Sequence, residues 1–190
     1  NSMTLQQIQR FDAATSGLPG SSSLANSAGM VNFPQSQRDY VRPGIMLYGI
    51  SPCRKKSAEE IGLKPVMTLQ CELIALNNVG AGETIGYGAA YTCQESKRIG
   101  IAAIGYGDGY PRHARNGTPV LVNGRMASIA GHVSMDMIAI DLTGHEDARV
   151  GDTVTLWGEG LPIEQVAPWA NSISYELICG VTARVTPRIE

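Results

Sequence analysis

The chain has 190 residues, 43% of them hydrophobic, and a net charge of −2, so it can bury a substantial core and has no basic field to attract nucleic acid. No apolar run approaches the roughly 18 residues that a membrane span needs, and the polar start Asn1–Thr4 does not resemble a signal peptide. The four cysteines show no metal-ligand spacing. We therefore expect a reduced, cytoplasmic protein with no metal site and no nucleic-acid or membrane partner.

The first part of the chain has the pattern of an α/β unit. Thr4 can cap a helix with apolar residues at helical spacing, and this helix should end near residues 17–20. Residues 21–29 form a short segment that ends in small polar residues, and residues 40–49 predict a short strand. The order helix, strand, connection, strand predicts parallel pairing. Because two strands cannot close a sheet, we expect residues 1–62 to be the last part of a larger α/β domain.

The character of the sequence changes at Lys64-Pro65. From there on, short runs rich in β-branched residues alternate with Gly, Asn, Asp and Pro turns, and Asn123-Gly124 is a strong hairpin signal. The strand-like runs are residues 66–76, 99–104, 119–122, 126–130, 137–142, 154–157 and 181–185. One helix is expected, over residues 162–170. The pattern predicts a mainly β fold in which residues 63–190 form an antiparallel barrel or sandwich.

The loop that follows the strand-like run 99–104 is the most unusual stretch. In residues 105–110, three glycines alternate with two tyrosines and an aspartate. Glycines at every second residue allow positive φ and a close approach to another surface. Loops held on a strand scaffold are also common places for binding groups. A wide turn between two strands is the alternative interpretation.

Four more positions carry side chains that a site could use. Ser27 offers a hydroxyl and neighbouring amides to an anion, and Arg42 precedes a Pro-Gly-Ile turn. Tyr87 lies between two glycines, and Met135 lies beside an aspartate. Each has an ordinary structural interpretation as well: a helix cap, a surface ion pair, a packing tyrosine and a core methionine. Taken singly, the residues leave both interpretations open.

Taken in chain order, these motifs resemble the C-terminal half of bacterial alanine racemase, a pyridoxal-phosphate (PLP) enzyme that interconverts L- and D-alanine. The motifs are Asn26-Ser27-Ala28, Arg42-Pro43-Gly44-Ile45, Gly86-Tyr87-Gly88, residues 105–112, Val133-Ser134-Met135-Asp136-Met137 and Ser174-Tyr175-Glu176. Family members have an N-terminal (β/α)8 barrel and a C-terminal β-domain. The resemblance therefore implies that residues 1–62 are the tail of an incomplete PLP-binding (β/α)8 barrel and residues 63–190 the C-terminal β-domain.

The resemblance also implies how the cofactor would be held. Ser27, Tyr175 and the backbone amides of Gly44 and Ile45 match ligands of the cofactor phosphate. Arg42 matches the residue that faces the pyridine nitrogen. A permanently charged guanidinium there disfavours a proton on that nitrogen, because two adjacent cations repel.

Four residues match positions that handle the substrate. Tyr87 resembles the base that removes the α-proton of L-alanine, and Met135 resembles the residue whose amide holds the substrate carboxylate. Tyr106 and Arg112 match residues that line the narrow entrance. In this family the matching tyrosines and methionine reach into the site of the other subunit, so the resemblance implies a homodimer with a shared site.

One family feature has no match in this sequence. The family's Schiff-base lysine lies near the start of the barrel, and the four lysines here lie in charged or turn contexts. We therefore expect a C-terminal fragment of an alanine racemase, inactive alone. Two alternatives are a related racemase of another small amino acid such as serine, and a non-catalytic β-domain that serves binding or dimerisation.

Overall fold

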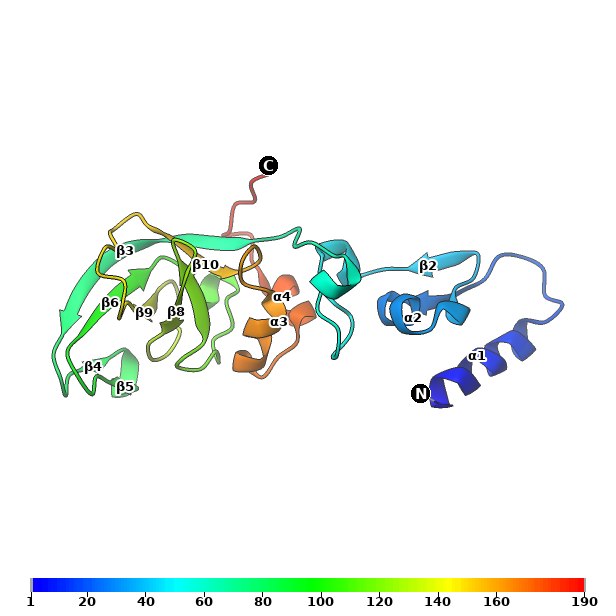
Figure 1. Ribbon diagram of the computed structural model, residues 1–190, viewed down its shortest axis with the longest axis horizontal. Helices are drawn as coiled ribbons and strands as arrows, with labels where there is room; N and C mark the ends of the chain where they lie inside the picture. The colour runs from blue at the N-terminus through cyan, green and yellow to red at the C-terminus, as the bar shows by residue number, and fades with distance from the viewer. Residues whose placement is uncertain (1, 190) are drawn as a thin grey trace. The chain divides into compact units, whose positions relative to one another are not determined.

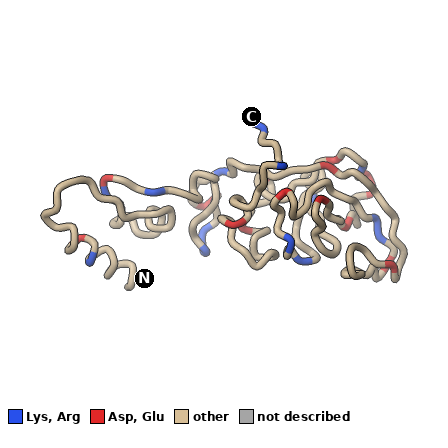
Figure 2. The backbone as a smooth tube through the Cα atoms, turned by 180° about the vertical axis from the view of Figure 1, so that it is seen from behind, with Lys and Arg blue, Asp and Glu red and all other residues tan. Residues whose placement is uncertain are grey.

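The computed structural model describes residues 2–189 and divides into two compact units, Asn1–Lys64 and Pro65–Glu190 (Figure 1). Positively and negatively charged residues occur along the backbone of both units (Figure 2). None of the helices in residues 2–189 combines the length and apolar character that a bilayer crossing requires.

The first unit contains a small parallel α/β arrangement. Its two strands pair in parallel, with Ser23 opposite Tyr40 and Asn26 opposite Arg42, so the predicted parallel pairing is confirmed. The elements are α1 (Ser2–Thr15), β1 (Ser23–Asn26), α2 (Ser27–Asn32), η1 (Pro34–Ser36), β2 (Tyr40–Arg42), η2 (Ile45–Tyr48) and η3 (Glu59–Ile61).

Two local predictions for this unit are wrong. Helix α1 already begins at Ser2, so Thr4 lies inside the helix and does not cap it. The strand expected over residues 40–49 ends at Arg42, because Pro43 has no N–H for a strand ladder, and Ile45–Tyr48 form the short helix η2 instead.

The second unit contains a closed antiparallel barrel, which confirms the predicted antiparallel β-domain and shows that it is a barrel and not a sandwich (Figure 1). The strands follow the order β10-β3-β6-β9-β8-β7, and β7 returns to β10. Their bounds are β3 (Leu69–Val79), β6 (Lys97–Ala102), β7 (Pro119–Val122), β8 (Arg125–Ile129), β9 (Ile138–Asp141) and β10 (Thr153–Trp157). The Asn123-Gly124 hairpin joins β7 to β8 as predicted, with positive φ at both residues.

The remaining elements of the second unit are short and are not strands of the barrel. They are β4 (Thr84–Ile85), η4 (Tyr87–Ala89), β5 (Tyr91–Thr92), η5 (Tyr106–Asp108), α3 (Ile163–Val166), η6 (Ala167–Ala170) and α4 (Ser174–Gly180). The strands β4 and β5 pair as a short hairpin, and α3 and α4 contact each other. The strand expected over residues 181–185 is not formed, and helix α4 and the short hairpin were not predicted.

The barrel interior is filled by apolar side chains from alternating strand positions. Leu73, Val120, Ile138, Ile140 and Val154 are completely buried. Burying a side chain of this size stabilises the fold by about 1.5–3 kcal/mol relative to leaving it exposed. The interior is thus a packed core, and binding groups must lie on the loops and edges around it.

An ion pair between β6 and β9 gives the barrel a pH-dependent contact. Lys97 Nζ lies 2.6 Å from Asp141 Oδ2, and each side chain is 16% exposed. Burial alone would raise the pKa of Asp141, but hydrogen bonds from Lys97 and Thr143 outweigh burial, so the pKa is lowered. A carboxyl with a lowered folded-state pKa stabilises the fold above its unfolded pKa of about 3.9 and loses that effect as the pH falls through the folded-state value.

We therefore expect Asp141→Asn to be less stable than the wild type near pH 7, with the difference shrinking below about pH 4. Thermal unfolding as a function of pH measures this difference, and Glu95→Gln, which removes an exposed carboxylate, is the control. A difference that is independent of pH would contradict the assignment.

Candidate functional site

A buried hydroxyl lies where the two parallel strands of the first unit end. Asn26 ends β1 and caps α2, its Oδ1 accepting a hydrogen bond from Gly29 N–H at 2.9 Å. This cap brings Ser27 to the first helical position, where it is only 2% exposed. The N–H of Gly44, just after β2, donates to Ser27 Oγ at 2.9 Å. Because this oxygen acts as an acceptor, the Ser27 hydroxyl hydrogen can donate to a ligand.

The turn after β2 adds backbone groups to that hydroxyl. Ile45 begins η2, and N–H groups at the start of a helix have no acceptor within the helix. Its side chain is 1% exposed and anchors the turn. A Cβ at Gly44 would meet no atom within 4 Å, so one side of the turn is open. A hydroxyl beside helix-start amides, with open space next to them, is a donor set that suits an anion such as phosphate.

Arg42 lies across the same strand end. Its Nη1 donates to Ser23 Oγ at 2.7 Å and its Nη2 to the Leu24 carbonyl at 3.4 Å. Within residues 2–189 no carboxylate pairs with this guanidinium, so the surface ion pair considered from the sequence is not formed. The guanidinium is instead fixed along β1 as a permanent positive charge.

A second group of predicted residues comes together on the barrel unit. Tyr106 N–H donates to the Ser134 carbonyl at 3.0 Å, and Gly107 N–H donates to the Met135 carbonyl at 2.7 Å. Arg112 places its guanidinium carbon 5.9 Å from the centre of the Tyr106 ring. The structure therefore joins Tyr106, Arg112 and Met135 into one cluster, although Met135 follows Tyr106 by nearly thirty residues in the sequence.

Close backbone packing explains the glycines of this cluster. A Cβ at Gly105 would lie 2.3 Å from the Ser134 carbonyl oxygen, so only glycine fits there. Among the three glycines of the loop, only Gly109 has a positive φ, of 100°. The predicted close approach to another surface is confirmed at this loop, while the predicted positive φ holds at one glycine of the three.

Tyr87 and Tyr175 lie on separate elements of the same unit. Tyr87 begins η4 in the β4–β5 hairpin, flanked by Gly86 and Gly88 at φ 76° and 69°, and it is 80% exposed. Tyr175 is the second residue of α4 and is 46% exposed. Neither side chain is part of the barrel core, so the packing interpretation of Tyr87 does not apply.

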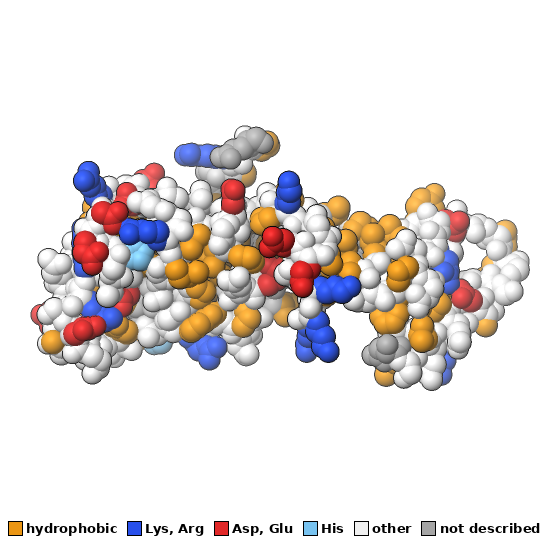
Figure 3. Space-filling view, viewed as in Figure 1, with side chains coloured by type: hydrophobic (Ala, Val, Ile, Leu, Met, Phe, Trp, Pro, Cys, Tyr) orange, Lys and Arg blue, Asp and Glu red, His pale blue; other side chains and the backbone are white. Residues whose placement is uncertain are grey.

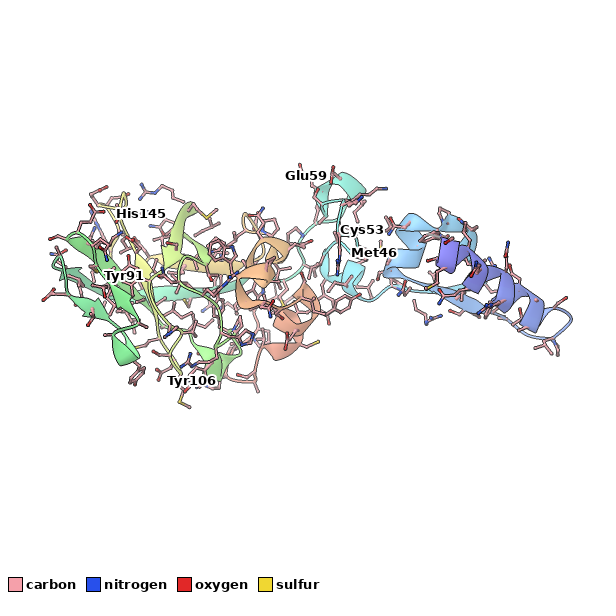
Figure 4. The ribbon with its side chains drawn as sticks, turned by 90° about the horizontal axis from the view of Figure 1, so that it is seen from below. Met46, Cys53, Glu59, Tyr91, Tyr106 and His145 are labelled. Carbon is pink, nitrogen blue, oxygen red and sulfur yellow. The ribbon has the colours of Figure 1, made fainter. Side chains whose placement is uncertain are left out.

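The histidine His145 is not part of this cluster. His145 lies on the opposite side of the barrel from Tyr106 (Figure 4). In the described part of the chain, no group of three or more His, Cys, Asp and Glu side chains could hold a metal ion.

Sequence reasoning missed one neighbour of the Tyr106 loop, the segment after α4, because the run of β-branched residues there suggested a strand.

A parallel α/β unit followed by a closed six-stranded barrel defines a two-part class of protein, with one α/β unit and one β-barrel unit. Residues 66–189 match the model of the alanine racemase C-terminal domain, and residues 1–52 match the model of the alanine racemase N-terminal domain. The chain belongs to the alanine racemase family.

Relatives and solved structures agree with this assignment. The chain is 53% identical over 184 residues to alanine racemase of Vibrio cholerae, covering 97% of this chain and 51% of that protein. It is 50% identical to alanine racemase of Vibrio parahaemolyticus, covering 100% of this chain and 52% of the relative. The chain thus spans about half the length of the relatives it matches.

The fold matches solved members of the family over nearly all of its length. The crystal structure of biosynthetic alanine racemase from Pseudomonas aeruginosa superposes with a TM-score of 0.95 at 49% identity, covering 99% of this chain and 52% of that chain. Alanine racemase from Bartonella henselae, with covalently bound pyridoxal phosphate, gives a TM-score of 0.87 at 32% identity over 97% of this chain and 51% of that chain.

Proposed function

We propose that this chain is the C-terminal half of a PLP-dependent alanine racemase that interconverts L- and D-alanine. The observation that carries the proposal is the match of one chain to both family domains in the correct order, over half the length of its relatives. In this proposal residues 1–62 are the last part of the (β/α)8 barrel and residues 63–190 are the β-domain.

The donor set of the first unit fits the phosphate of PLP. Ser27 supplies a hydroxyl hydrogen and Ile45 a backbone N–H group, and the open side of Gly44 leaves room beside them. The Gly44 N–H, which we also assign to the phosphate, donates to Ser27 Oγ in this structure and would exchange that acceptor for the phosphate when PLP binds. We assign Tyr175 as a further hydroxyl ligand of the phosphate. When bound, PLP supplies the electron-withdrawing ring that makes the α-proton of an amino acid acidic. Arg42 would lie beside the ring nitrogen, and its permanent positive charge would disfavour a proton there.

The exposed residues of the barrel unit handle the substrate in this proposal. Tyr87 removes the proton from the α-carbon of L-alanine. The Met135 carbonyl accepts a hydrogen bond from the Gly107 N–H. The N–H of Met135 holds the substrate carboxylate. Tyr106 and Arg112, stacked on each other, narrow the entrance and favour a small amino acid.

A homodimer follows from the same assignment. Hydrophobic side chains lie at the surface among charged ones (Figure 3), and the exposed ones on the barrel unit include Tyr87, Met126, Met135 and Met137. Large exposed apolar side chains are typical of surfaces that another molecule covers. We propose that a second copy covers them and that Tyr87, Tyr106 and Met135 complete its site, in a cytoplasmic enzyme whose D-alanine serves either the cell wall or alanine catabolism.

The Ser27 hydroxyl offers a direct test of the phosphate assignment. In the full-length protein we expect Ser27→Ala to weaken PLP affinity by about 10- to 100-fold, since a hydrogen bond to a charged group contributes about 1.5–3 kcal/mol. Titration of the apoprotein with PLP measures this change. Ser21→Ala, which removes an exposed hydroxyl before the same strand, should leave the affinity unchanged. If the wild type, Ser27→Ala and Ser21→Ala all bound PLP with equal affinity, the phosphate assignment would be wrong.

A further inference from the structure

The loop that carries Tyr106 is packed between two other backbone segments. On one side, a Cβ at Gly105 would lie 2.3 Å from the Ser134 carbonyl oxygen. On the other side, a Cβ at Gly109 would lie 2.0 Å from the carbonyl oxygen of Gly180, the last residue of α4. The loop is thus the middle layer of three backbones, and only glycines allow this spacing.

Polar contacts join the middle layer to the segment after α4. Thr182 N–H donates to the Asp108 carbonyl at 3.0 Å, and Thr182 Oγ1 donates to the Gly107 carbonyl at 3.0 Å. Arg184 Nε lies 3.2 Å from Asp108 Oδ1. The other carboxylate oxygen of Asp108 accepts from Gly105 N–H at 2.9 Å, so one carboxylate fixes both the turn of the loop and the segment after α4.

The peptide groups of Gly107 connect the segment after α4 to Met135. The Gly107 carbonyl accepts from Thr182, while the Gly107 N–H donates to the Met135 carbonyl at 2.7 Å. Tyr106 and Met135 themselves are 44% and 56% exposed, so side-chain packing within this chain does little to hold them. Their positions therefore depend on this series of backbone contacts.

We propose that Asp108, Thr182 and Arg184 are positioning residues that clamp the Tyr106 loop against Met135 and thereby set the geometry of the substrate entrance. The inference rests on the proposed function for what the loop does, but the clamp itself is a property of this chain. Because Gly180 ends the helix that carries Tyr175, the clamp also ties the substrate loop to the element assigned to the phosphate. In this proposal Thr182 and Arg184 influence the substrate only through their contacts with the loop.

The test uses two variants that remove one clamp contact each. Thr182→Val keeps the side-chain shape and removes the hydroxyl donor, and Arg184→Gln removes the cation. Arg125→Gln is the matched control. Arg125 lies on β8 and forms an ion pair with Asp147, so this variant also breaks an arginine–aspartate pair, but away from the clamp. Amide hydrogen exchange of Tyr106 and Gly107 in this chain should accelerate by about fivefold or more in both clamp variants, while the barrel amides and the control variant keep wild-type rates.

The same three variants in the full-length enzyme separate positioning from mere stability. With the protein fully folded, we expect the KM for L-alanine to rise by about threefold or more in both clamp variants, with kcat less affected, and to stay unchanged in the control. Unchanged exchange at Tyr106 and Gly107 would overturn the clamp. Faster exchange with an unchanged KM would reduce Thr182 and Arg184 to structural residues. If the wild-type full-length protein did not act on alanine, the proposed function would fail, and the exchange rates alone would still confirm or overturn the clamp.

Discussion

Gly109→Ala should destabilise the barrel unit by about 3 kcal/mol or more, a fall in Tm of about 10 °C or more. Gly109 has a φ of 100°, which disfavours any residue with a Cβ, and that Cβ would lie 2.0 Å from the Gly180 carbonyl oxygen. The Tyr106 loop and the end of α4 meet here through their backbones, so neither can move aside as a flexible side chain would. Thermal unfolding of the variant measures the effect.

Gly144→Ala separates the backbone strain at a positive φ from the steric clash of the new Cβ. Gly144 has a φ of 79°, but a Cβ there would meet nothing within 4 Å, so only the backbone strain of about 1–2 kcal/mol applies. If Gly109→Ala destabilised the chain no more than Gly144→Ala, the close packing of the Tyr106 loop on the end of α4 would be wrong.

Tyr87→Phe should abolish most of the racemisation in the full-length enzyme. A positioned proton-transfer group contributes about 10²- to 10⁴-fold to the rate, and the variant removes the hydroxyl that takes the proton while keeping the ring. PLP affinity should be unchanged, because the assigned phosphate ligands are other residues. In the two-base mechanism proposed here each face of the α-carbon has its own base, so solvent exchange of the α-proton should be lost for L-alanine and retained for D-alanine.

Tyr106→Phe is the comparison for that result, since it removes the hydroxyl of the tyrosine assigned to the entrance. It should change the KM for alanine more than the balance between the two exchange reactions. Deuterium incorporation from D₂O into each enantiomer, followed by NMR, distinguishes the two variants. Equal loss of exchange from both enantiomers in Tyr87→Phe, or a one-sided loss in Tyr106→Phe, would mean that the base is assigned to the wrong tyrosine.

Most of the barrel could be predicted from the sequence because its strands are short, rich in β-branched residues and separated by strong turns. The Asn123-Gly124 hairpin fixed the β7–β8 connection without any tertiary information. The failures lie where tertiary contacts decide. Residues 181–185 have the composition of a strand, but the N–H and hydroxyl of Thr182 bond to the Tyr106 loop instead of a ladder. Helix α4 has seven residues, too few for periodicity to reveal.

The candidate site was predictable residue by residue only through the family resemblance. Ser27 and Gly44 looked like a cap and a turn glycine, and the hydrogen bond between them depends on the parallel pairing of β1 with β2. The alternating glycines did signal a close approach of the 105–109 loop to another surface. Which surface it would meet could not be known, because Ser134 and Gly180 are far away in sequence and reach the loop only in the folded barrel unit.

The most direct test of the central claim is racemisation of L-alanine by the full-length protein that contains this chain, with L-serine measured in parallel. Chiral analysis of the product should find PLP-dependent formation of D-alanine, a slower reaction with serine, and no D-alanine from the 190-residue chain alone. None of the four lysines of this chain matches the family's Schiff-base lysine, and Lys97 is held in an ion pair with Asp141. A full-length protein that failed to racemise alanine, or preferred serine, would contradict the account.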